Sequence, residues 1–323
     1  MNDTPFPDHD PIDAVITWVN GDSAAHRRKR HAYMAKSSVP LHENATNPHR
    51  WACNDEILFC LQSIGTHAEW IRTIWIVVDD ETPDLSILPA ALTSKVKFVF
   101  HRDIFDGFND VLPTFNSLSI EIMICRIEGL SERFLYFNDD VFLTAPVQPT
   151  DVFKGTSPVL RGKWASLAAL THNFDAQKDP SLFNHFMQIN AAEILGFGAT
   201  QVFCAAHVAH PFKRSTMSEL FEHYHDVFKS NISHRFRDLS QFLPQGLHNH
   251  ACILENDAII SPMQDYRHIR SGQGQDRAPT EAWALLENVS EEKVKFLCIN
   301  DLPKLEALIP GVRGWLGDVV GAA

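Results

Sequence analysis

The chain has 323 residues, of which 45% are hydrophobic and 21% are charged, and its formal net charge is -12. This size allows a substantial buried core, and the acidic balance argues against an extended nucleic-acid surface and hence against nucleic acid as a partner. The start, MNDTPFPDHDP, lacks the features of a secretory signal, and no stretch approaches the roughly 20 apolar residues of a membrane-spanning helix. We therefore expect a cytoplasmic protein without a transmembrane segment.

The six cysteines are scattered and form no CxxC pair. In a chain of this length, such sparse cysteines are typical of reduced core residues in a cytosolic protein. Their even number leaves a disulfide open as the alternative. The cysteines are Cys53, Cys60, Cys125, Cys204, Cys252 and Cys298.

The first half of the chain alternates between predicted strands and helices. Residues 1–11 read as a leader, and the nearly continuous apolar run at 12–20 predicts a strand buried on both faces. Further buried strands are predicted at 74–80, 96–101 and 134–137, and helices begin near Asn54-Asp55 and Asn116-Ser117. This alternation predicts an α/β core at 12–150 with a mostly parallel sheet.

The second half, residues 151–323, is predicted to be mainly helical and to complete the active site. Helical periodicity covers 181–195 and 213–229, and a polar connector occupies 270–279. Short helices then surround an apolar segment, VKFLCIND. The boundary near residue 150 is soft because this segment, at 296–301, can return to the first sheet.

The polar residues that follow the predicted strands are candidates for chemistry, because ligands of open α/β sheets bind beyond the carboxyl ends of the strands. Asp139 and Asp140 directly follow the strand at 134–137. Two adjacent carboxylates cannot both stay ionised in a tight site without a cation or hydrogen-bond donors, and hard oxygen ligands suit Mg²⁺ or Mn²⁺. The alternative is that the pair only caps a turn.

Two further groups could contact an anionic substrate. Thr114, Asn116 and Ser117 stand at a predicted helix start, where free N–H groups can receive a phosphate or a sugar hydroxyl, or where the side chains simply cap the helix. The segments HPFKR and HRFR place cations in an acidic chain, as a pyrophosphate site requires, unless they form a solvated helix face. No P-loop, GxGxxG, GxSxG or HExxH motif occurs.

Several long segments resemble the Stealth proteins, which are bacterial capsule and exopolysaccharide phosphotransferases related to the catalytic subunit of the animal N-acetylglucosamine-1-phosphotransferase. IDAVITWVNG, NDEILFCLQSI followed by WIRTIWIVVDD, and the run from His101 to Leu143 are similar to the first two conserved regions of that family. HPFKR through SHRFRDLSQF resembles the third region and FLCIND the fourth. The resemblance spans residues 12 to about 301.

The resemblance implies a glycosyltransferase-A-like nucleotide-sugar fold with an added helical lobe. It also implies metal-dependent transfer of a hexose-1-phosphate, expected to be N-acetylhexosamine-1-phosphate, from a UDP-sugar to a glycan hydroxyl in capsular or exopolysaccharide synthesis. The implied donor-binding residues are Asp13, Trp18, Asn20, Gly21, Asn116 and Ser117. Asp139 and Asp140 would hold Mg²⁺ or Mn²⁺, and the implied catalytic residues are His210, Arg237 and Asp301, with His210 or Asp301 as the general base.

One departure from the family pattern leaves other functions open. Leu58 and Gln62 stand where family members commonly have Arg. The alternatives are an ordinary glycosyltransferase of the same fold, which would release a nucleoside diphosphate, and an inactive module that binds a sugar nucleotide or a glycan. Association with the inner membrane is expected only through a polysaccharide-synthesis complex.

Overall fold

The computed structural model describes residues 10–38, 40–47, 51, 54–276, 278–291 and 294–321. Cys53 and all but the last two residues of the predicted leader lie outside these ranges. The central element is a five-stranded sheet with the strand order β10-β4-β1-β2-β3. Its strands are β1 (Ile12–Thr17), β2 (Ile74–Val78), β3 (Val96–Phe100), β4 (Arg133–Asn138) and β10 (His210–Lys213).

Four of these five strands are parallel. β1 pairs in parallel with β2 and β4, and β2 pairs in parallel with β3, whereas β10 runs antiparallel along β4. The apolar runs of the first half form the parallel strands because each is bounded by turn residues and connected by helices. The predicted α/β class with a mostly parallel sheet is confirmed.

The strand β3 differs from its prediction. It lies at the edge of the sheet, and of its five residues only Val99 is buried. Phe98 is 38% exposed, although its sequence suggested a strand buried on both faces. The prediction of a buried strand was therefore wrong here, because position in a sheet is decided by the neighbouring strands and is not written in the strand's own residues.

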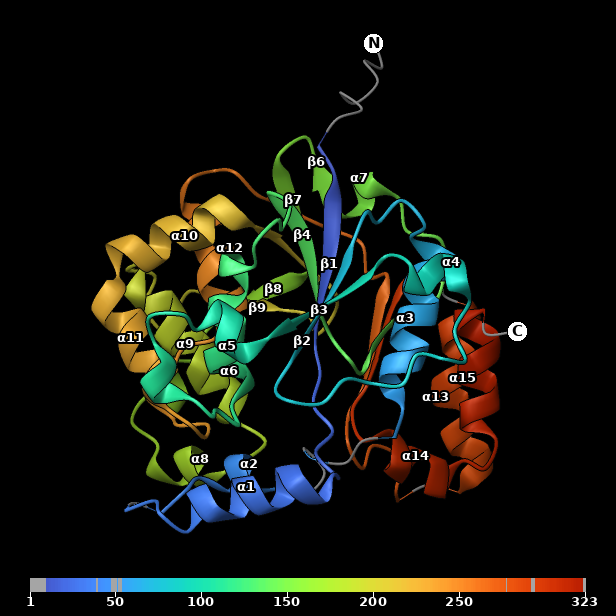
Figure 1. The fold of residues 1–323 in the computed structure, drawn as a ribbon, viewed down its shortest axis with the longest axis horizontal. Coiled ribbons are helices and arrows are strands. Elements are labelled where there is room, and N and C mark those ends of the chain that lie inside the picture. The colour runs from blue at the N-terminus through green and yellow to red at the C-terminus, as the bar shows by residue number, and fades with distance from the viewer. Residues whose placement is uncertain are drawn as a thin grey trace.

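Helices cover both faces of the sheet (Figure 1). One side carries α3 (Glu56–His67), α4 (Ala90–Thr93), α13 (Pro279–Glu291), α14 (Leu302–Leu308) and α15 (Val312–Val320). The other side carries α5 (His101–Ile104), α6 (Ser117–Met123), α9 (Phe183–Ile194), α10 (Arg214–His223), α11 (His225–Ser233) and α12 (Pro244–Leu254). Alternate residues of β1 divide between the two sides: Ile16 packs toward the first set and Val15 toward the second.

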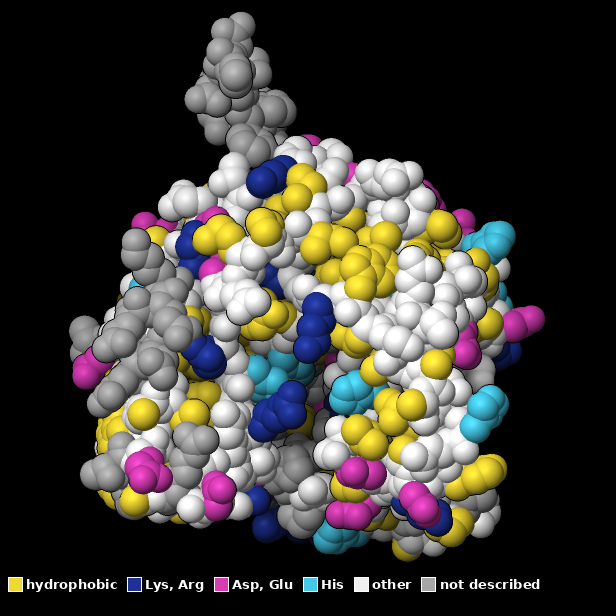
Figure 2. Space-filling view, turned by 180° about the vertical axis from the view of Figure 1, so that it is seen from behind, with side chains coloured by type: hydrophobic (Ala, Val, Ile, Leu, Met, Phe, Trp, Pro, Cys, Tyr) yellow, Lys and Arg dark blue, Asp and Glu magenta, His cyan; other side chains and the backbone are white. Residues whose placement is uncertain are grey.

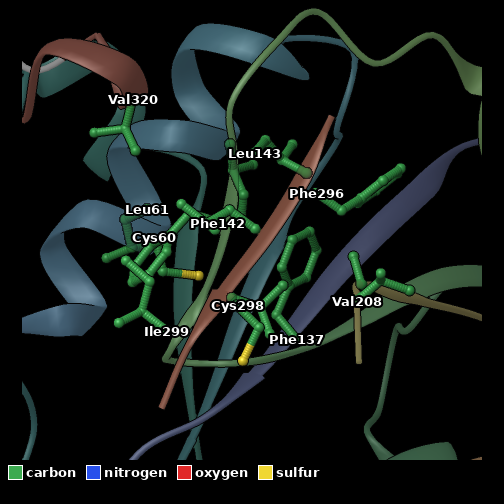
Figure 3. Packing of buried hydrophobic residues seen from close by; sticks show 14 of the residues in the cluster. Cys60, Leu61, Phe137, Phe142, Leu143, Val208, Phe296, Cys298, Ile299 and Val320 are labelled. Atoms are coloured by element: carbon green, nitrogen blue, oxygen red, sulfur yellow. The ribbon is translucent and has the colours of Figure 1, made fainter. Parts of the chain in front are cut away.

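A three-stranded sheet joins distant parts of the chain. It consists of β5 (Val141–Leu143), β12 (Tyr266–Ile269) and β13 (Phe296–Ile299), with β13 in the middle. Figure 3 shows Phe142 of β5 and Cys298 of β13 packed with Leu61 of α3 in one apolar cluster. Since β10 also joins the main sheet, residues on both sides of position 150 share both sheets.

The predicted helices are present with one adjustment. The helix predicted at 181–195 is α9, whereas the periodic run at 213–229 is broken at Tyr224 into α10 and α11. Four cysteines, Cys60, Cys125, Cys252 and Cys298, are buried free thiols, and Cys204 is half-buried. The remaining helices and strands are α1 (Ala24–Met34), α2 (Glu43–Thr46), α7 (Pro149–Val152), β6 (Phe153–Lys154), β7 (Ser157–Leu160), β8 (Gly162–Ala165), α8 (Phe174–Lys178), β9 (Val202–Ala205) and β11 (Ile259–Ile260).

Among the described residues, no helix combines the length and the apolar character that crossing a bilayer requires.

Candidate functional site

A cluster of carboxylates lies just beyond the carboxyl end of β4. Asp139 and Asp140 follow the last residue of that strand, and Glu56 of α3 approaches them closely enough for its charge to act on both. Burial raises the pKa of Asp139 well above its usual range, and the charges of Asp140 and Glu56 raise it further. We call Glu56, Asp139 and Asp140 the carboxylate cluster.

The two oxygens of Asp140 have different surroundings. Oδ2 accepts a hydrogen bond of 2.6 Å from Asn300 Nδ2, which follows β13. Oδ1 is buried and has no hydrogen-bond partner among the residues that the structure describes. A buried carboxylate oxygen without a donor is costly, and a bound cation would satisfy it, so the cluster fits the predicted Mg²⁺ or Mn²⁺.

Histidines from two later segments meet at this cluster. Ligand atoms of Asp140, His207 and Cys298 all lie within 4.8 Å of one another. His207 stacks on His268 of β12 with a ring-centroid distance of 5.0 Å, and His268 Nε2 lies 2.6 Å from Asn300 Oδ1. No spacing along the chain relates His207 or His268 to Asp140, so their proximity could not be found without the fold.

Asp301, a predicted catalytic residue, is placed one residue beyond the partner of Asp140. It stands at the start of α14 with a left-handed backbone (φ 63°), and its Oδ2 accepts a 2.8 Å hydrogen bond from Ser271 Oγ. With Arg270 and Lys304 it lines a small hollow at this end of the molecule. The structure therefore brings Asp301 to the region of the carboxylate cluster through β13.

His210 lies on β10 directly opposite Tyr136 of β4, and it is buried. Burial, together with the charges of the nearby His207 and His248, lowers the pKa of His210 to about 3. The imidazole is thus neutral at physiological pH. A neutral imidazole can accept a proton, but so low a pKa makes it a weak base near pH 7.

The structure brings together Arg237 and Ser117, which were both predicted to be site residues. Arg237 Nη2 donates a 2.7 Å hydrogen bond to Ser117 Oγ at the start of α6, and Nη1 lies 3.3 Å from Asn44 Oδ1 of α2. Burial lowers the pKa of Arg237, and the charge of Glu121 opposes that effect. The guanidinium therefore stands among neutral oxygens, where an anion could approach it.

Asn116 acts as the helix cap that was the alternative explanation of its position. Its Oδ1 accepts from Leu118 N at 3.2 Å, and its Nδ2 donates to His234 O and Gln241 Oε1, both at 2.9 Å. The side chain is buried, and its donors and acceptor are engaged within the protein. Asn116 therefore has a structural role beside Ser117, and its polar groups are not available to bind the nucleotide-sugar donor.

The structure places Asp13 away from the other predicted donor-binding residues. It lies at the amino end of β1, fully buried, and its carboxylate accepts from Arg72 Nη2 at 2.6 Å, Trp75 Nε1 at 3.0 Å and Ser131 N at 2.9 Å. Burial acts to raise the pKa of Asp13, but these hydrogen bonds outweigh burial and hold the pKa below its usual value. The predicted contact of Asp13 with a nucleotide is not favoured, because ligands of such sheets bind beyond the carboxyl ends of the strands, whereas Asp13 lies at the amino end of β1.

Trp18, Asn20 and Gly21 lie beyond the carboxyl end of β1, on the predicted edge. Trp18 is buried, and its indole Nε1 has no hydrogen-bond partner within the described ranges. Asn20 Nδ2 donates to Glu81 Oε2 at 3.0 Å. A Cβ atom at Gly21 would lie 2.3 Å from the carbonyl oxygen of Trp51, so only glycine fits this close approach.

The other cations of the HPFKR and HRFR segments do not form a pyrophosphate site. Lys213 pairs with Asp257, and Arg214 Nε donates to the carbonyl oxygen of Cys125 at 3.0 Å. Arg235 Nη1 donates to the carbonyl oxygens of Val111 and Pro113. The prediction that these residues gather around one anion was wrong, because backbone carbonyls and a carboxylate hold them in separate places.

The two positions that depart from the family pattern lie on α3. Leu58 packs against the apolar core, and Gln62 Nε2 donates to the carbonyl oxygen of Gly321 at 3.2 Å. Gln62 therefore contacts the end of α15, where an Arg would also find a carbonyl partner. Nothing in these contacts links Leu58 or Gln62 directly to the carboxylate cluster.

A series of polar side chains connects Arg237 with the carboxylate cluster. The sequence did not predict this connection. Glu121 of α6 is buried beside Arg237 and Tyr136, and burial raises its pKa to about 7. The hydroxyl of Tyr136 donates to Asn138 Oδ1 at 2.8 Å, and Asn138 Nδ2 lies 3.3 Å from His207 Nε2. The only signal in the sequence was that Glu121 is the one charged residue of the helix SLSIEIM.

Figure 2 shows histidine, lysine and arginine side chains gathered around a hollow at the centre of the face opposite to that in Figure 1. An open hollow is lined by His268, Arg270, Ser271, Gly272 and Gln273. His268 belongs to the group around Asp140, so this hollow adjoins the carboxylate cluster and offers a polar approach to it.

Matches to protein-family models support the resemblance to the Stealth proteins. Residues 10–38 match the model of Stealth protein conserved region 1, and residues 50–159 match that of conserved region 2. The chain carries the first two Stealth regions. The family resemblance is therefore confirmed, and these regions contain β1 with Asn20 and Gly21, the start of α6 with Ser117, and the pair Asp139 and Asp140.

Relatives carry names from polysaccharide synthesis. The chain is 29% identical to an exopolysaccharide phosphotransferase of Streptomyces coelicolor, over 92% of this chain and 47% of that protein, so it spans about half the length of that relative. It is also 29% identical to a capsular polysaccharide phosphotransferase of Haemophilus influenzae, over 90% of this chain and 78% of that protein. A crystal structure of the galactosyltransferase LgtC aligns with a TM-score of 0.45 and 10% identity, covering 96% of each chain.

Proposed function

We propose that the chain transfers a sugar 1-phosphate, with N-acetylhexosamine-1-phosphate as the expected group, from a UDP-sugar to a hydroxyl group of a glycan in capsular or exopolysaccharide synthesis. The Stealth regions and the names of the relatives support this class of reaction. The observation that carries the proposal is the carboxylate cluster, where a buried oxygen of Asp140 lacks a donor among the described residues.

The proposed cofactor is Mg²⁺ or Mn²⁺, held by Asp139 and Asp140. The cation would neutralise charge on the diphosphate of the donor. The support for this pair is chemical: their oxygens are hard ligands, and a cation would offset the burial and the negative charges of Asp140 and Glu56 that raise the pKa of Asp139.

In the proposed reaction, the oxygen of the acceptor hydroxyl attacks the β-phosphorus of the donor. The phosphoanhydride bond breaks, UMP leaves, and the sugar–phosphate bond survives in a new phosphodiester. Arg237, oriented by Ser117 and Asn44, would bind a phosphate oxygen, which stabilises the charge that moves in the transition state. His210 or Asp301 would accept the hydroxyl proton, and the low pKa of His210 makes that imidazole a weak base near pH 7.

The released nucleotide distinguishes this reaction from its alternatives. Purified protein is incubated with UDP-sugars, oligosaccharide acceptors and Mg²⁺ or Mn²⁺, and the nucleotides are separated by chromatography. We expect UMP, which disappears with EDTA and falls by a factor of about 10² to 10³ in Asp140→Ala, as for loss of one electrostatic contact to the transition state. Glu222→Ala, an exposed carboxyl on α10, is the control and should retain activity.

Release of UDP instead of UMP would contradict the proposal and identify a glycosyltransferase. Donor binding without release of either nucleotide would identify a binding module. We further propose that the chain works in the cytoplasm and reaches the inner membrane through a polysaccharide-synthesis complex, which co-purification with that complex would test.

A further inference from the structure

Glu121 is a buried carboxyl at the centre of the polar group around Arg237. It comes from the middle of α6 and is only 6% exposed. Arg237 faces it from the segment before α12, Tyr136 from β4, and Gln245 from α12, while Ser117 lies one turn earlier on its own helix. Of these four neighbours, only Arg237 carries a fixed charge.

Arg237 has little else to balance its charge. Its side chain donates hydrogen bonds to neutral oxygens of Ser117 and Asn44, and within the described ranges it forms no ion pair. The electrostatic partners that act on its guanidinium are Glu121 and Tyr136. Whether the surroundings of Arg237 are neutral or negative therefore depends on whether Glu121 holds a proton.

The surroundings of Glu121 allow its carboxyl to be either protonated or ionised near neutral pH. One of its oxygens, Oε2, is buried without a hydrogen-bond partner among the described residues, so the ionised form is poorly solvated. Burial raises the pKa of Glu121 to about 7, against the opposing influence of Arg237. Near neutral pH the protonated and ionised forms are then similarly populated.

We propose that Glu121 is a positioning residue that controls the affinity of Arg237 for the donor diphosphate: when Glu121 is ionised its charge offsets that of the guanidinium and opposes binding of the diphosphate, and when it takes up a proton the charge of the guanidinium is left for the donor. This inference rests on the proposed function. The ionised carboxylate and the diphosphate are like charges that compete for one cation, so donor binding favours uptake of a proton from the solvent by Glu121.

The experiment measures binding of UDP-N-acetylglucosamine by titration calorimetry at pH 6 and pH 8, at fixed Mg²⁺ concentration. In the wild type we expect the Kd to rise by up to about tenfold from pH 6 to pH 8, the ratio of the protonated fractions of a group with a pKa of about 7. Titrations in two buffers of different ionisation enthalpy should show uptake of a proton near pH 7.

Glu121→Gln copies the protonated form and should bind at pH 8 as tightly as the wild type binds at pH 6, without proton uptake. Glu222→Gln, the same substitution at an exposed carboxyl of α10, should keep the wild-type pH dependence. A merely structural role of Glu121 would lower affinity at both pH values and leave their ratio unchanged. If Glu121→Gln does not fold, Arg237→Gln decides, because it should bind weakly with a pH ratio near one.

The outcomes separate this inference from the proposed function. If the wild type does not bind the UDP-sugar at pH 6, both are contradicted. If it binds but the Kd is the same at pH 6 and pH 8, or if Glu121→Gln keeps the pH ratio of the wild type, only the role of Glu121 is overturned.

Discussion

At the scale of single residues, burial and hydrogen bonding separate the predicted site residues into two kinds. Asp140 has an oxygen without a donor in the described part of the chain, and Arg237 has a guanidinium on neutral oxygens. Asp13 and Asn116, in contrast, are surrounded by protein partners that use their polar groups. Residues of the first kind can bind a substrate, whereas those of the second kind hold the fold.

Asp13 gives a direct test of that division. Asp13→Asn removes a buried carboxylate that accepts several hydrogen bonds and pairs with Arg72, whose side chain is 44% exposed, and we expect the free energy of unfolding to fall by about 2 to 4 kcal/mol at pH 7. Since the folded pKa is lowered, the stabilisation is present above the unfolded pKa and is lost as the pH falls through the folded pKa. Urea unfolding of both proteins at pH 7 and pH 3 should therefore show a smaller difference at the lower pH.

Two comparisons accompany this test. The exposed Asp84→Asn should change stability by less than about 0.5 kcal/mol. Folded Asp13→Asn should bind a UDP-sugar with the wild-type Kd, because Asp13 lies at the amino end of β1. A large loss of donor affinity in a fully folded variant would restore Asp13 to the nucleotide pocket.

At the scale of elements, the turn after β1 depends on one close backbone contact. Gly21 approaches Trp51, which lies in a segment far along the chain, and Arg30 of α1 stacks over the Trp51 ring at 4.3 Å. This contact fixes α1 and the Trp51 segment beside the carboxyl end of β1. The turn after β1 is therefore held in place by the close approach of the Gly21 and Trp51 backbones, which any side chain at position 21 would block.

We expect Gly21→Ala to destabilise the protein by about 1 to 3 kcal/mol and to weaken donor binding, because the added methyl group must displace backbone atoms 2.3 Å away. Thermal unfolding and calorimetric titration measure the two effects. Gly314→Ala is the matched control: its Cβ would meet nothing within 4 Å, and alanine favours the helix α15. Equal stability of the two variants would show that the Trp51 contact does not exist in solution.

At the scale of the whole molecule, β13 ties the end of the chain to its first half. β13 pairs with β5, which directly follows Asp140, and it carries Asn300 to the Asp140 carboxylate. Its apolar side chains are packed in the same cluster as α3 and the main sheet (Figure 3). Core packing of β13 and the geometry of the carboxylate cluster are therefore coupled.

Phe296→Ala tests this coupling. Phe296 is fully buried on β13, so its truncation should cost about 3 to 5 kcal/mol of stability and also reduce product formation by moving Asn300. Phe98→Ala, on the edge strand β3, removes the same atoms from a side chain that is 38% exposed and should cost far less. Urea unfolding and the nucleotide-release assay provide both readouts; similar losses in the two variants would contradict the argument.

The amino-acid sequence by itself determined the α/β alternation, the four parallel strands and the resemblance to Stealth proteins, and it singled out Asp139 and Asp140 as candidate metal ligands. These features depend on local apolar runs, turn residues and contiguous motifs, which a linear pattern contains. The sequence did not predict the break at Tyr224 in the helical run at 213–229, nor the position of β3 at the sheet edge. Both features are set by the elements that pack against these segments.

Only the tertiary structure decided which distant side chains meet. His207, His268 and Asn300 reach Asp140 from three separate segments, and Glu121 faces Arg237 across two elements. The same packing removed Lys213, Arg214 and Arg235 from the predicted anion site by giving each a partner elsewhere. Charge and burial depend on these through-space neighbours, and residue spacing along the chain does not encode them.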